Sequence, residues 1–322
     1  MPVNPETSHV DQIEAAIASN GAARSALIAS WARSSTLHRL DPAEKHSPER
    51  VSDSELRKVR QEIEPLVDVA QASLERLHLA VGGVGCCVLL ADRNGILVER
   101  RGAAVDDQTF CGWGLWPGTR WSEESVGTNG IGTCLVEQRA TTIHRDQHFL
   151  TRNTVLSCTA APVYDDGGRL IAVLDISSCH ADQTEGYVNL LAMAVVDAAA
   201  RIETDYFRSV FTRERILVVP AADKGGRALI AVDVNDLVVG ATRAARQALG
   251  LTAACLRKSL PAADLLGAAG RANESLAGAE RGVLQRALAR ADGNVTAAAG
   301  SLGMSRATFY RKLQRLDMPH VH

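Results

Sequence analysis

Aromatic side chains are scarce in this chain of 322 residues, where four Trp, four Tyr and five Phe make up only 4% of the sequence. Apolar residues still supply 46%, so aliphatic side chains must build the cores of the two or three domains that this length allows. The chain also lacks an apolar run long enough to cross a bilayer, and its polar N-terminus shows no signal peptide. These absences predict a cytoplasmic protein with no membrane partner.

Paired cysteine motifs and a phosphate-binding loop are missing too. The seven cysteines are odd in number and widely scattered, which favours neither a zinc site nor a disulfide framework. They are Cys86, Cys87, Cys111, Cys134, Cys158, Cys179 and Cys255, and we expect most of them to be reduced core residues. No Gly-x-x-x-x-Gly-Lys-Ser/Thr motif occurs in the sequence, which excludes nucleotide hydrolysis by a P-loop.

The near-neutral net charge of −2 hides an uneven distribution. Residues 276–322 carry seven Lys or Arg against three acids, a net of +4, which leaves −6 for the rest of the chain. A basic terminal module on an acidic body is typical of a protein in which one small domain contacts nucleic acid.

Residues 293–316 have the pattern of two short helices joined by a tight turn. Asn294 or Thr296 can cap the first helix, and Gly303 supplies the left-handed residue that ends it. Ser305 can cap the second helix, which carries an apolar stripe at spacings of four and three residues. The stripe consists of Phe309, Leu313 and Leu316.

The opposite face of the second helix is basic. It suits the major groove of double-stranded DNA, with its first turn toward base edges and its cations toward phosphates. Arg306 is the candidate for a guanine contact, and the alternative is a helical hairpin with a solvated basic face. The predicted DNA-binding residues are Thr296, Ser305, Arg306, Thr308, Tyr310, Arg311, Lys312 and Arg315.

Two β-hairpins are predicted before this tail. Residues 86–91 and 96–99 are apolar runs joined by Asp-Arg-Asn-Gly, and residues 155–164 lead through Asp-Asp-Gly-Gly into residues 170–176. Because a segment richer in turns and helix lies between the hairpins, we expect a mixed α/β (α+β) domain of sensor-like order.

The segment between the hairpins holds the candidate ligand-binding residues. Three of the four Trp lie close together there, which favours a pocket wall, because small-molecule pockets are mostly apolar with a few polar anchors. The alternative is that these rings fill a core. The predicted ligand-binding residues are Cys111, Trp113, Trp116, Trp121, Thr128, Asn129, Cys134, His148 and Cys158. Thr128 and Asn129 are expected to begin a helix whose backbone amides could receive an anionic or carbonyl group, or simply to cap it.

Metal and redox chemistry remain alternatives at the same segment. His144 and His148 are four apart and could share a helix face as two metal ligands would, but no third ligand is specified. Cys111, Cys134 and Cys158 could include a haem ligand or a redox switch. We predict no cofactor, with haem and metal kept as the alternatives.

The tail closely resembles the C-terminal DNA-binding domain of the Fis family. The shared positions are Gly293-Asn294, Thr296, Ala298-Ala299, Leu302-Gly303 and Ser305-Arg306. By position, the DNA-contacting residues of that family fall on Ser305, Arg306, Thr308 and Arg311. Tyr310 replaces a residue that is basic in some relatives, so the resemblance does not specify the preferred bases.

Residues 25–215 look like the sensor region of acetoin-regulator-type bacterial activators. The motifs shared with their GAF domain are Trp121-Ser122-Glu123, Gly127-Thr128-Asn129, Gly132-Thr133, His148-Phe149, Cys158, Ala161-Pro162 and Leu174-Asp175, and Ser30-Trp31 with Leu40-Asp41-Pro42 resembles their N-terminal helices. Those relatives carry an ATP-hydrolysing AAA+ domain before the tail and act on sigma-54 polymerase. Residues 211–276 are too few for that domain, so ATP-driven activation is excluded, and a strand, turn, strand and helix over residues 228–249 instead resemble the start of a PAS domain.

The predicted domains follow from these patterns. They are an N-terminal helical region (1–80), a GAF-like sensor (81–182), a long helix (183–214), a short PAS-like segment (215–270) and a Fis-type helix-turn-helix (274–322). The long helix is expected to pair with a twin through Val188, Leu191, Ala192, Val195, Ala199 and Ile202.

We therefore predict a homodimeric one-component regulator that is not an enzyme. A small-molecule effector in the GAF domain modulates binding to operator DNA without ATP hydrolysis, and RNA polymerase is a further candidate partner. The alternatives are a haem, metal or thiol redox sensor of transcription, a GAF-fold cysteine enzyme of the sulfoxide reductase type, and an antagonist that occupies a relative's operator.

Overall fold

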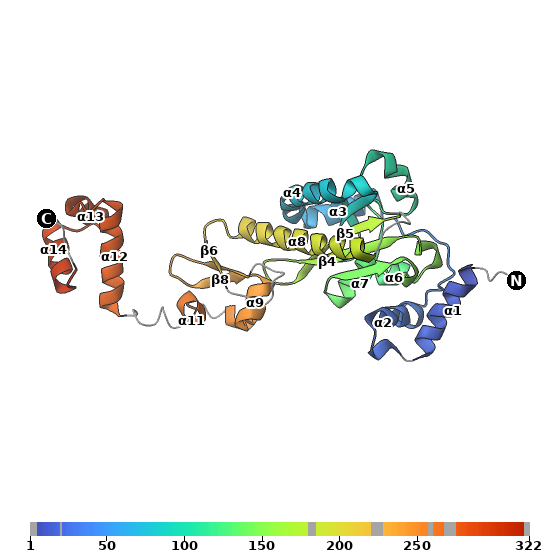
Figure 1. The fold of residues 1–322 in the computed structure, drawn as a ribbon. Helices are drawn as coiled ribbons and strands as arrows, with labels where there is room; N and C mark the ends of the chain where they lie inside the picture. Colours follow the sequence, from blue (N-terminus) through green and yellow to red (C-terminus); the bar gives the residue numbers. More distant parts are fainter. Residues whose placement is uncertain are drawn as a thin grey trace. The chain divides into compact units, whose positions relative to one another are not determined.

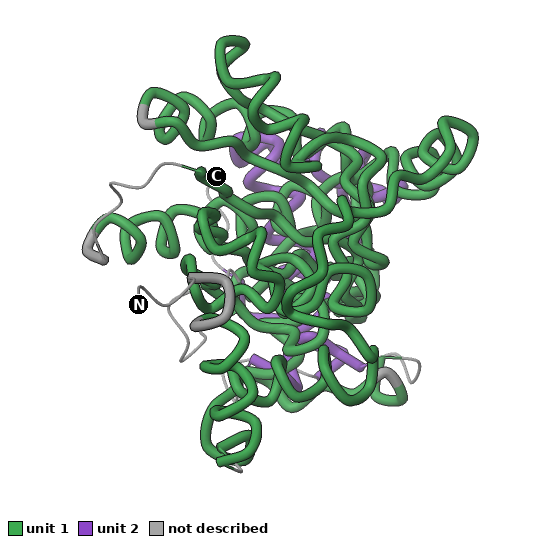
Figure 2. Tube along the Cα trace, turned by 90° about the vertical axis from the view of Figure 1, so that its right-hand side faces the viewer, with its two compact units in different colours: residues 1–259 green, residues 260–322 purple. Residues whose placement is uncertain are grey.

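The protein divides into two compact units, residues 1–259 and residues 260–322 (Figure 2). The structure is a computed structural model that describes residues 5–19, 21–179, 185–219, 228–256, 260–266 and 275–318. Across these ranges, no helix is both long enough and apolar enough to cross a membrane.

A five-stranded antiparallel sheet lies at the centre of the first unit, in the order β2-β1-β5-β4-β3. The strands are β1 (Cys86–Asp92), β2 (Leu97–Arg101), β3 (Thr141–His144), β4 (Ser157–Tyr164) and β5 (Leu170–Ser178). Both predicted hairpins are confirmed, because β1 pairs with β2 and β4 pairs with β5. The first turn closes because Asp92 Oδ1 accepts hydrogen bonds from Asn94 N (3.0 Å) and Ile96 N (2.8 Å), while Gly95 takes a φ of +80°.

Helices α3 (Asp53–Glu62), α4 (Glu64–Val81) and α8 (Glu185–Val210) cover one face of the sheet, here called the α4–α8 face (Figure 1). Alternate strand residues point to it, among them Leu90 and Leu174, which are both fully buried. Aliphatic side chains build this core, as expected of a chain with few aromatic residues.

The apolar stripe of the long helix packs on the sheet of its own chain. Of the residues predicted to pair with a twin helix, Val188, Leu191, Val195, Ala199 and Ile202 are buried and Ala192 is half-buried. The prediction of that dimer interface was wrong, because α4 and β4 already cover this stripe. Large apolar side chains of α8 that remain exposed include Leu190, Met193 and, at the end of the helix, Val210.

The opposite face of the sheet, here called the α7 face, is covered by a second set of helices (Figure 1). They are α1 (Pro5–Ala18), α2 (Ala26–Ala32), the π-helical turn η2 (Arg33–Leu37), α5 (Asp107–Gly112), α6 (Glu123–Val126) and α7 (Gly130–Glu137). Short 3₁₀ turns connect the elements of this unit: η1 (Gly21–Ala23), η3 (Gly82–Val84), η4 (Ala104–Asp106), η5 (Arg145–Gln147) and η6 (Thr151–Asn153). Ile13 of α1 and Trp31 of α2 are buried in the same cluster as Leu89 and Trp121.

The predicted N-terminal region, residues 1–80, is therefore divided between the two faces of the sheet. Helices α1 and α2 pack on the α7 face, whereas α3 and α4 belong to the α4–α8 face. The physical reason is that each helix has one apolar side to bury and an antiparallel sheet of this kind offers two apolar faces.

A small antiparallel sheet, in the order β6-β7-β8, follows α8. Its elements are β6 (Arg215–Val218), β7 (Leu229–Val232) and β8 (Val238–Ala241), with helices α9 (Arg243–Leu249) and α10 (Ala253–Leu256). The strand, turn, strand and helix predicted over residues 228–249 are confirmed, whereas β6 was not predicted. The rings of Phe207 and Phe211, 4.7 Å apart, anchor the end of α8 to Leu229 and Ala231 of this sheet.

The second unit is helical, with α11 (Ala262–Leu266), α12 (Leu276–Arg290), α13 (Val295–Ser301) and α14 (Arg306–Arg315). Asn294 Oδ1 caps α13 by accepting from Thr296 N (3.0 Å) and Ala297 N (3.1 Å). Gly303 takes a φ of +67° in the turn, and Ser305 Oγ caps α14 by accepting from Thr308 N (3.2 Å). The helix-turn-helix pattern is thereby confirmed, with the stripe of Phe309, Leu313 and Leu316 buried against α12 and α13.

Candidate functional site

The first two turns of α14 present two exposed arginines, Arg306 and Arg311. Arg306 is exposed, and its guanidinium carbon lies 5.5 Å from the centre of the Tyr310 ring. Arg311 is one turn further along, where its Nη2 donates to Thr308 Oγ1 at 3.3 Å. Within the described ranges neither arginine forms an ion pair, so both remain available to an anionic partner.

The other two cations of this helix are already engaged. Lys312 and Arg315 both form ion pairs with Glu280 of α12, and these interactions hold the pKa of Glu280 below its usual range, first through the hydrogen bond from Lys312. Arg281 Nη2 donates to the carbonyl of Leu316 at the end of α14. Lys312 and Arg315 therefore connect α14 to α12, a role that the sequence pattern did not predict.

Thr296 is exposed in the first turn of α13, as expected of a residue that contacts DNA.

On the α7 face, three of the predicted ligand-binding residues meet in one buried cluster. Trp121 is 1% exposed and its Nε1 donates to Gly114 O at 2.8 Å. Cys134 of α7 and Cys158 of β4 belong to the same cluster. Trp113 packs at its margin, where the Arg152 guanidinium lies 5.8 Å from the ring centre.

Trp116 and Cys111 lie outside this cluster. Trp116 is half-buried and Cys111 is exposed on α5, so the predicted pocket wall is not continuous along residues 111–121. The sequence placed these residues together only because they are neighbours in the chain. Cys111 lies on α5, before the turn at Gly114 with its φ of +78°, and Trp116 lies after that turn.

Thr128 and Asn129 lie at the start of α7 as predicted. Asn129 Oδ1 accepts from Gly132 N at 2.8 Å, so this side chain caps the helix. Thr128 is fully buried, and its Oγ1 lies 2.7 Å from Ser30 Oγ of α2. Ser30 of α2 is therefore already a hydrogen-bond partner of the Thr128 hydroxyl.

Ser30 belongs to a buried network that sequence reasoning missed. Glu123 is 2% exposed and accepts from Ser30 Oγ (2.5 Å) and from Arg33 Nε (2.9 Å). Arg33 also donates to Glu137 at 3.0 Å, and its hydrogen bond to Glu123 is the largest of the causes that raise its pKa. Only the resemblance singled out Ser30 and Glu123, because these partners lie about 90 positions apart in the chain.

His148 is fully buried and neutral in character. Its Nδ1 donates to Arg145 O at 3.0 Å, which leaves Nε2 as an acceptor that has no partner among the described residues. Desolvation lowers its pKa to about 4. His144 ends β3 and a 3₁₀ turn follows it, so the two histidines do not share a helix face, and the described residues contain no cluster of three metal ligands.

Asp175 is the most unusual group of the α7 face. It lies within β5 and is fully buried. Its Oδ2 accepts from Ser177 Oγ at 2.6 Å, while Oδ1 has no partner among the described residues. Burial raises its pKa to about 7 and also raises the pKa of the thiols of Cys87, Cys134 and Cys158.

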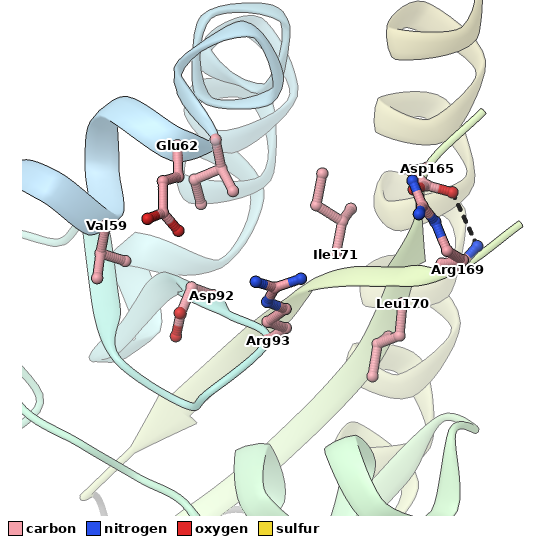
Figure 3. A pocket seen from close by; sticks show the side chains of 9 residues that line it. Val59, Glu62, Asp92, Arg93, Asp165, Arg169, Leu170 and Ile171 are labelled. Carbon is pink, nitrogen blue, oxygen red and sulfur yellow. Dashed lines mark hydrogen bonds and ion pairs between the residues drawn. The ribbon is translucent and has the colours of Figure 1, made fainter. Parts of the chain in front are cut away.

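A separate surface pocket of about 200 Å³ lies where the end of α3 meets the two hairpin turns (Figure 3). Its lining carries charges of both signs: the acidic residues are Glu62, Asp92 and Asp165, and the basic residues are Arg93 and Arg169. Arg169 is paired with Asp165 at 2.9 Å, and Asp92 accepts from the amides of its own turn. Because the turns use these groups themselves, this pocket is a weaker candidate than the α7 face for a ligand site.

Comparisons with known families divide the chain in the same way as its structure. The GAF domain family matches residues 65–202, and the family of bacterial regulatory proteins of the Fis type matches residues 275–316. The chain combines a GAF domain with a Fis-type DNA-binding domain. The GAF match includes α4 and most of α8, so the domain extends beyond the predicted residues 81–182 on both sides.

Regulators of catabolic operons are among the similar proteins. The acetoin catabolism regulatory protein of Cupriavidus necator is 34% identical over 221 residues, which are 67% of this chain and 33% of that protein. The acetoin dehydrogenase operon transcriptional activator of Bacillus subtilis is 27% identical over 178 residues, 55% of this chain and 29% of that protein. The chain thus spans about a third of the length of these relatives.

A solved structure shares the fold of the sensor region. The crystal structure of the Escherichia coli DhaR(N)–DhaL complex contains a chain with a TM-score of 0.52 and 18% identity. The match covers 71% of this chain and 78% of that one. At this identity the likeness concerns the fold alone.

Proposed function

We propose that this protein is a ligand-responsive transcriptional regulator whose helix-turn-helix binds operator DNA. The observation that carries the proposal is the exposed pair Arg306 and Arg311 in the first two turns of a capped helix, free of ion pairs within the described ranges. A helix presented in this way places arginine forks toward base edges and phosphates in a major groove. Because bacterial operators lie in the cytoplasm, this function implies that location.

The proposed effector site is the α7 face of the GAF domain. It combines an apolar cluster around Trp121 with buried polar atoms that have no partner among the described residues, His148 Nε2 and Asp175 Oδ1. Such atoms are costly to bury alone, and a small molecule that hydrogen-bonds to them recovers that cost. Regulation would then need no ATP hydrolysis, since the printed sequence holds no P-loop motif.

We further propose that the regulator acts as a homodimer, so that two reading helices reach adjacent turns of one DNA face. The face of α8 with exposed Leu190 and Met193, 63% and 71% exposed, supports this proposal in place of the buried stripe. RNA polymerase is a proposed further partner, whose recruitment or exclusion would convert operator binding into a change in transcription.

Thiol redox sensing and cysteine catalysis receive little support from the buried cysteines, whereas Cys111 is exposed. Burial raises the pKa of Cys87, Cys134 and Cys158, which keeps these thiols protonated, and the protonated thiol is the unreactive form. A regulator that is not an enzyme therefore fits this domain better than a sulfoxide reductase.

The decisive experiment is DNA binding by the full chain after selection of a target from a pool of random duplexes. Arg306→Ala should weaken binding to the selected duplex by about 1–3 kcal/mol and relax base choice at one position. Gln314→Ala is the matched control, because Gln314 is an exposed residue of the same helix outside the predicted contacts. Equal affinities for wild type and Arg306→Ala would remove α14 as the reading helix.

A second experiment separates sensing from DNA binding. His148→Ala or Trp121→Ala should abolish the response of operator affinity to an effector while the ligand-free variant still binds the duplex, because the second unit folds on its own core. A normal response in either variant would place the effector elsewhere.

A further inference from the structure

Arg100 of β2 points into the α7 face of the sheet. It pairs in register with Leu89 of β1, and residues directly opposite each other across two strands share a face. Leu89 belongs to the buried cluster of that face, and the Arg100 side chain is only 8% exposed. A guanidinium is thus buried at the edge of the layer that we propose to bind an effector.

Among the described residues, only one side of this guanidinium has a hydrogen-bond partner. Nη1 donates to Asp107 Oδ1 at 2.7 Å, while Nε and Nη2 are buried and have no hydrogen-bond partner among the described residues. The hydrogens on Nε and Nη2 point from the same edge of the planar group, with the spacing of two carboxylate oxygens. This free edge is the fork with which arginine binds a carboxylate bidentately.

The surroundings favour an organic anion over a bare inorganic one. The Arg100 guanidinium carbon lies 4.7 Å from the centre of the Trp116 ring and 5.3 Å from that of Phe110. These rings hold the guanidinium by cation–π attraction and present apolar surface beside the free edge. Gly102 allows the close fit, since a Cβ there would lie 2.5 Å from Nη2.

We propose that Arg100 binds the carboxylate of a small organic acid, so that the effector of this regulator is an anion with an apolar body. The inference rests on the proposed sensory function of the GAF domain and names the chemical class of its ligand. Asp107, which is 42% exposed, holds the guanidinium in place from the solvent side. The bound carboxylate would accept hydrogen bonds from Nε and Nη2 of Arg100, on the other side of the guanidinium.

Calorimetric titration of the full chain with matched probes tests this proposal. The probes are propionate and benzoate, each compared with its neutral amide at constant ionic strength, with chloride and sulfate as inorganic anions. We expect the carboxylates to bind at least about tenfold more tightly than the amides, since the amides lack the charge that the fork requires.

Three variants locate the binding. Arg100→Lys keeps the charge but loses the fork, and should weaken carboxylate binding at least about tenfold. Gly102→Ala keeps Arg100 but displaces its guanidinium, because the new Cβ would lie 2.5 Å from Nη2 and 2.9 Å from Cζ, so it should weaken binding even where the lysine variant folds poorly. Arg101→Lys is the control, because Arg101 lies on the same strand but opposite Val88 on the α4–α8 face, and donates to Glu99 at 2.8 Å.

The outcomes separate this inference from the proposed function. Three results would each overturn the proposed carboxylate site. The first is carboxylate binding that survives both Arg100→Lys and Gly102→Ala. The others are binding of sulfate or chloride as tight as that of benzoate, and failure of every carboxylate to bind. If uncharged compounds alter operator binding while carboxylates do not bind, the proposed carboxylate site is wrong and the proposed regulatory function is retained. If Arg306→Ala leaves operator affinity unchanged, the regulatory function falls whatever Arg100 binds.

Discussion

The two faces of the central sheet bury polar groups in different ways. On the α4–α8 face the buried carboxylate of Glu99 lies on an edge strand, where Arg60 and Arg101 form ion pairs with it. On the α7 face Asp175 lies on the middle strand, and one of its oxygens has no partner among the described residues. The first face neutralises its buried carboxylate with two arginines, whereas the carboxyl group of Asp175 on the second face has no ion pair among the described residues.

We propose that this difference locates the ligand specificity of the GAF domain on the α7 face. An unsatisfied buried polar atom lowers stability, and proteins retain such atoms mainly where a ligand or a switch uses them. An all-apolar interior would bind any compound of suitable size, whereas His148, Asp175 and Arg100 can each reject ligands that lack a matching group. Substitutions on the two faces should therefore have different signatures.

The largest loss of stability is expected from the packing face. Leu174→Ala removes a fully buried side chain from the core between the sheet and α8, and should lower the free energy of unfolding by about 2–5 kcal/mol. Urea denaturation of wild type and variant measures this loss. A decrease in the free energy of unfolding of less than about 1 kcal/mol would mean that the α4–α8 face is loosely packed, contrary to the difference described between the two faces.

Asp175→Asn should change how stability depends on pH. The folded pKa of about 7 lies above the ordinary value of 3.8, so the folded state holds more protons between these values. Stability from this group is full below about pH 4 and is lost as pH rises through 7, by roughly 4 kcal/mol at most. The asparagine variant should lack this slope and be more stable than wild type at about pH 8; equal slopes from pH 5 to about pH 8 would show that Asp175 is not buried as a neutral acid.

His148→Gln should remove a slope of opposite sign. The folded pKa of about 4 lies below the ordinary value of 6.5, so the unfolded state binds a proton that the folded state does not. Stability from this group is present above about pH 6.5 and is lost as pH falls toward 4, by roughly 3 kcal/mol at most. Denaturation midpoints at about pH 5 and about pH 7.5 would test it, and wild type should lose more stability on acidification than the variant does.

The smallest effect is expected at the contact between α2 and the GAF loops. Ser30→Ala removes the hydroxyl that donates to Glu123 and should cost about 1–2 kcal/mol. Ser54→Ala, at an exposed position of α3, is the control and should be nearly neutral. Similar values for the two serines would show that α2 does not depend on the buried network.

Local features of the fold could be predicted, and long-range ones could not. The turn at Gly95 and the caps at Asn294 and Ser305 lie where the sequence places them, because each depends on residues within a few positions. The long helix was also found, but its stripe was assigned to a twin helix, since periodicity shows that a face is apolar without showing what covers it. Of the predicted ligand-binding residues, Trp121, Cys134 and Cys158 share one buried cluster, and their role in ligand binding stays a prediction.

By itself, the sequence determined the two domain types, the hairpins, the helix-turn-helix and its basic face, because caps, turn residues and hydrophobic periodicity act over short distances along the chain. Only the tertiary structure decided which groups meet. It joined Ser30 to Glu123 across 93 positions and tied Lys312 and Arg315 to Glu280. It also left one edge of Arg100 without a partner among the residues that the structure describes. The physical reason is that desolvation and pairing of charges depend on what packs around them in space, which no local pattern encodes.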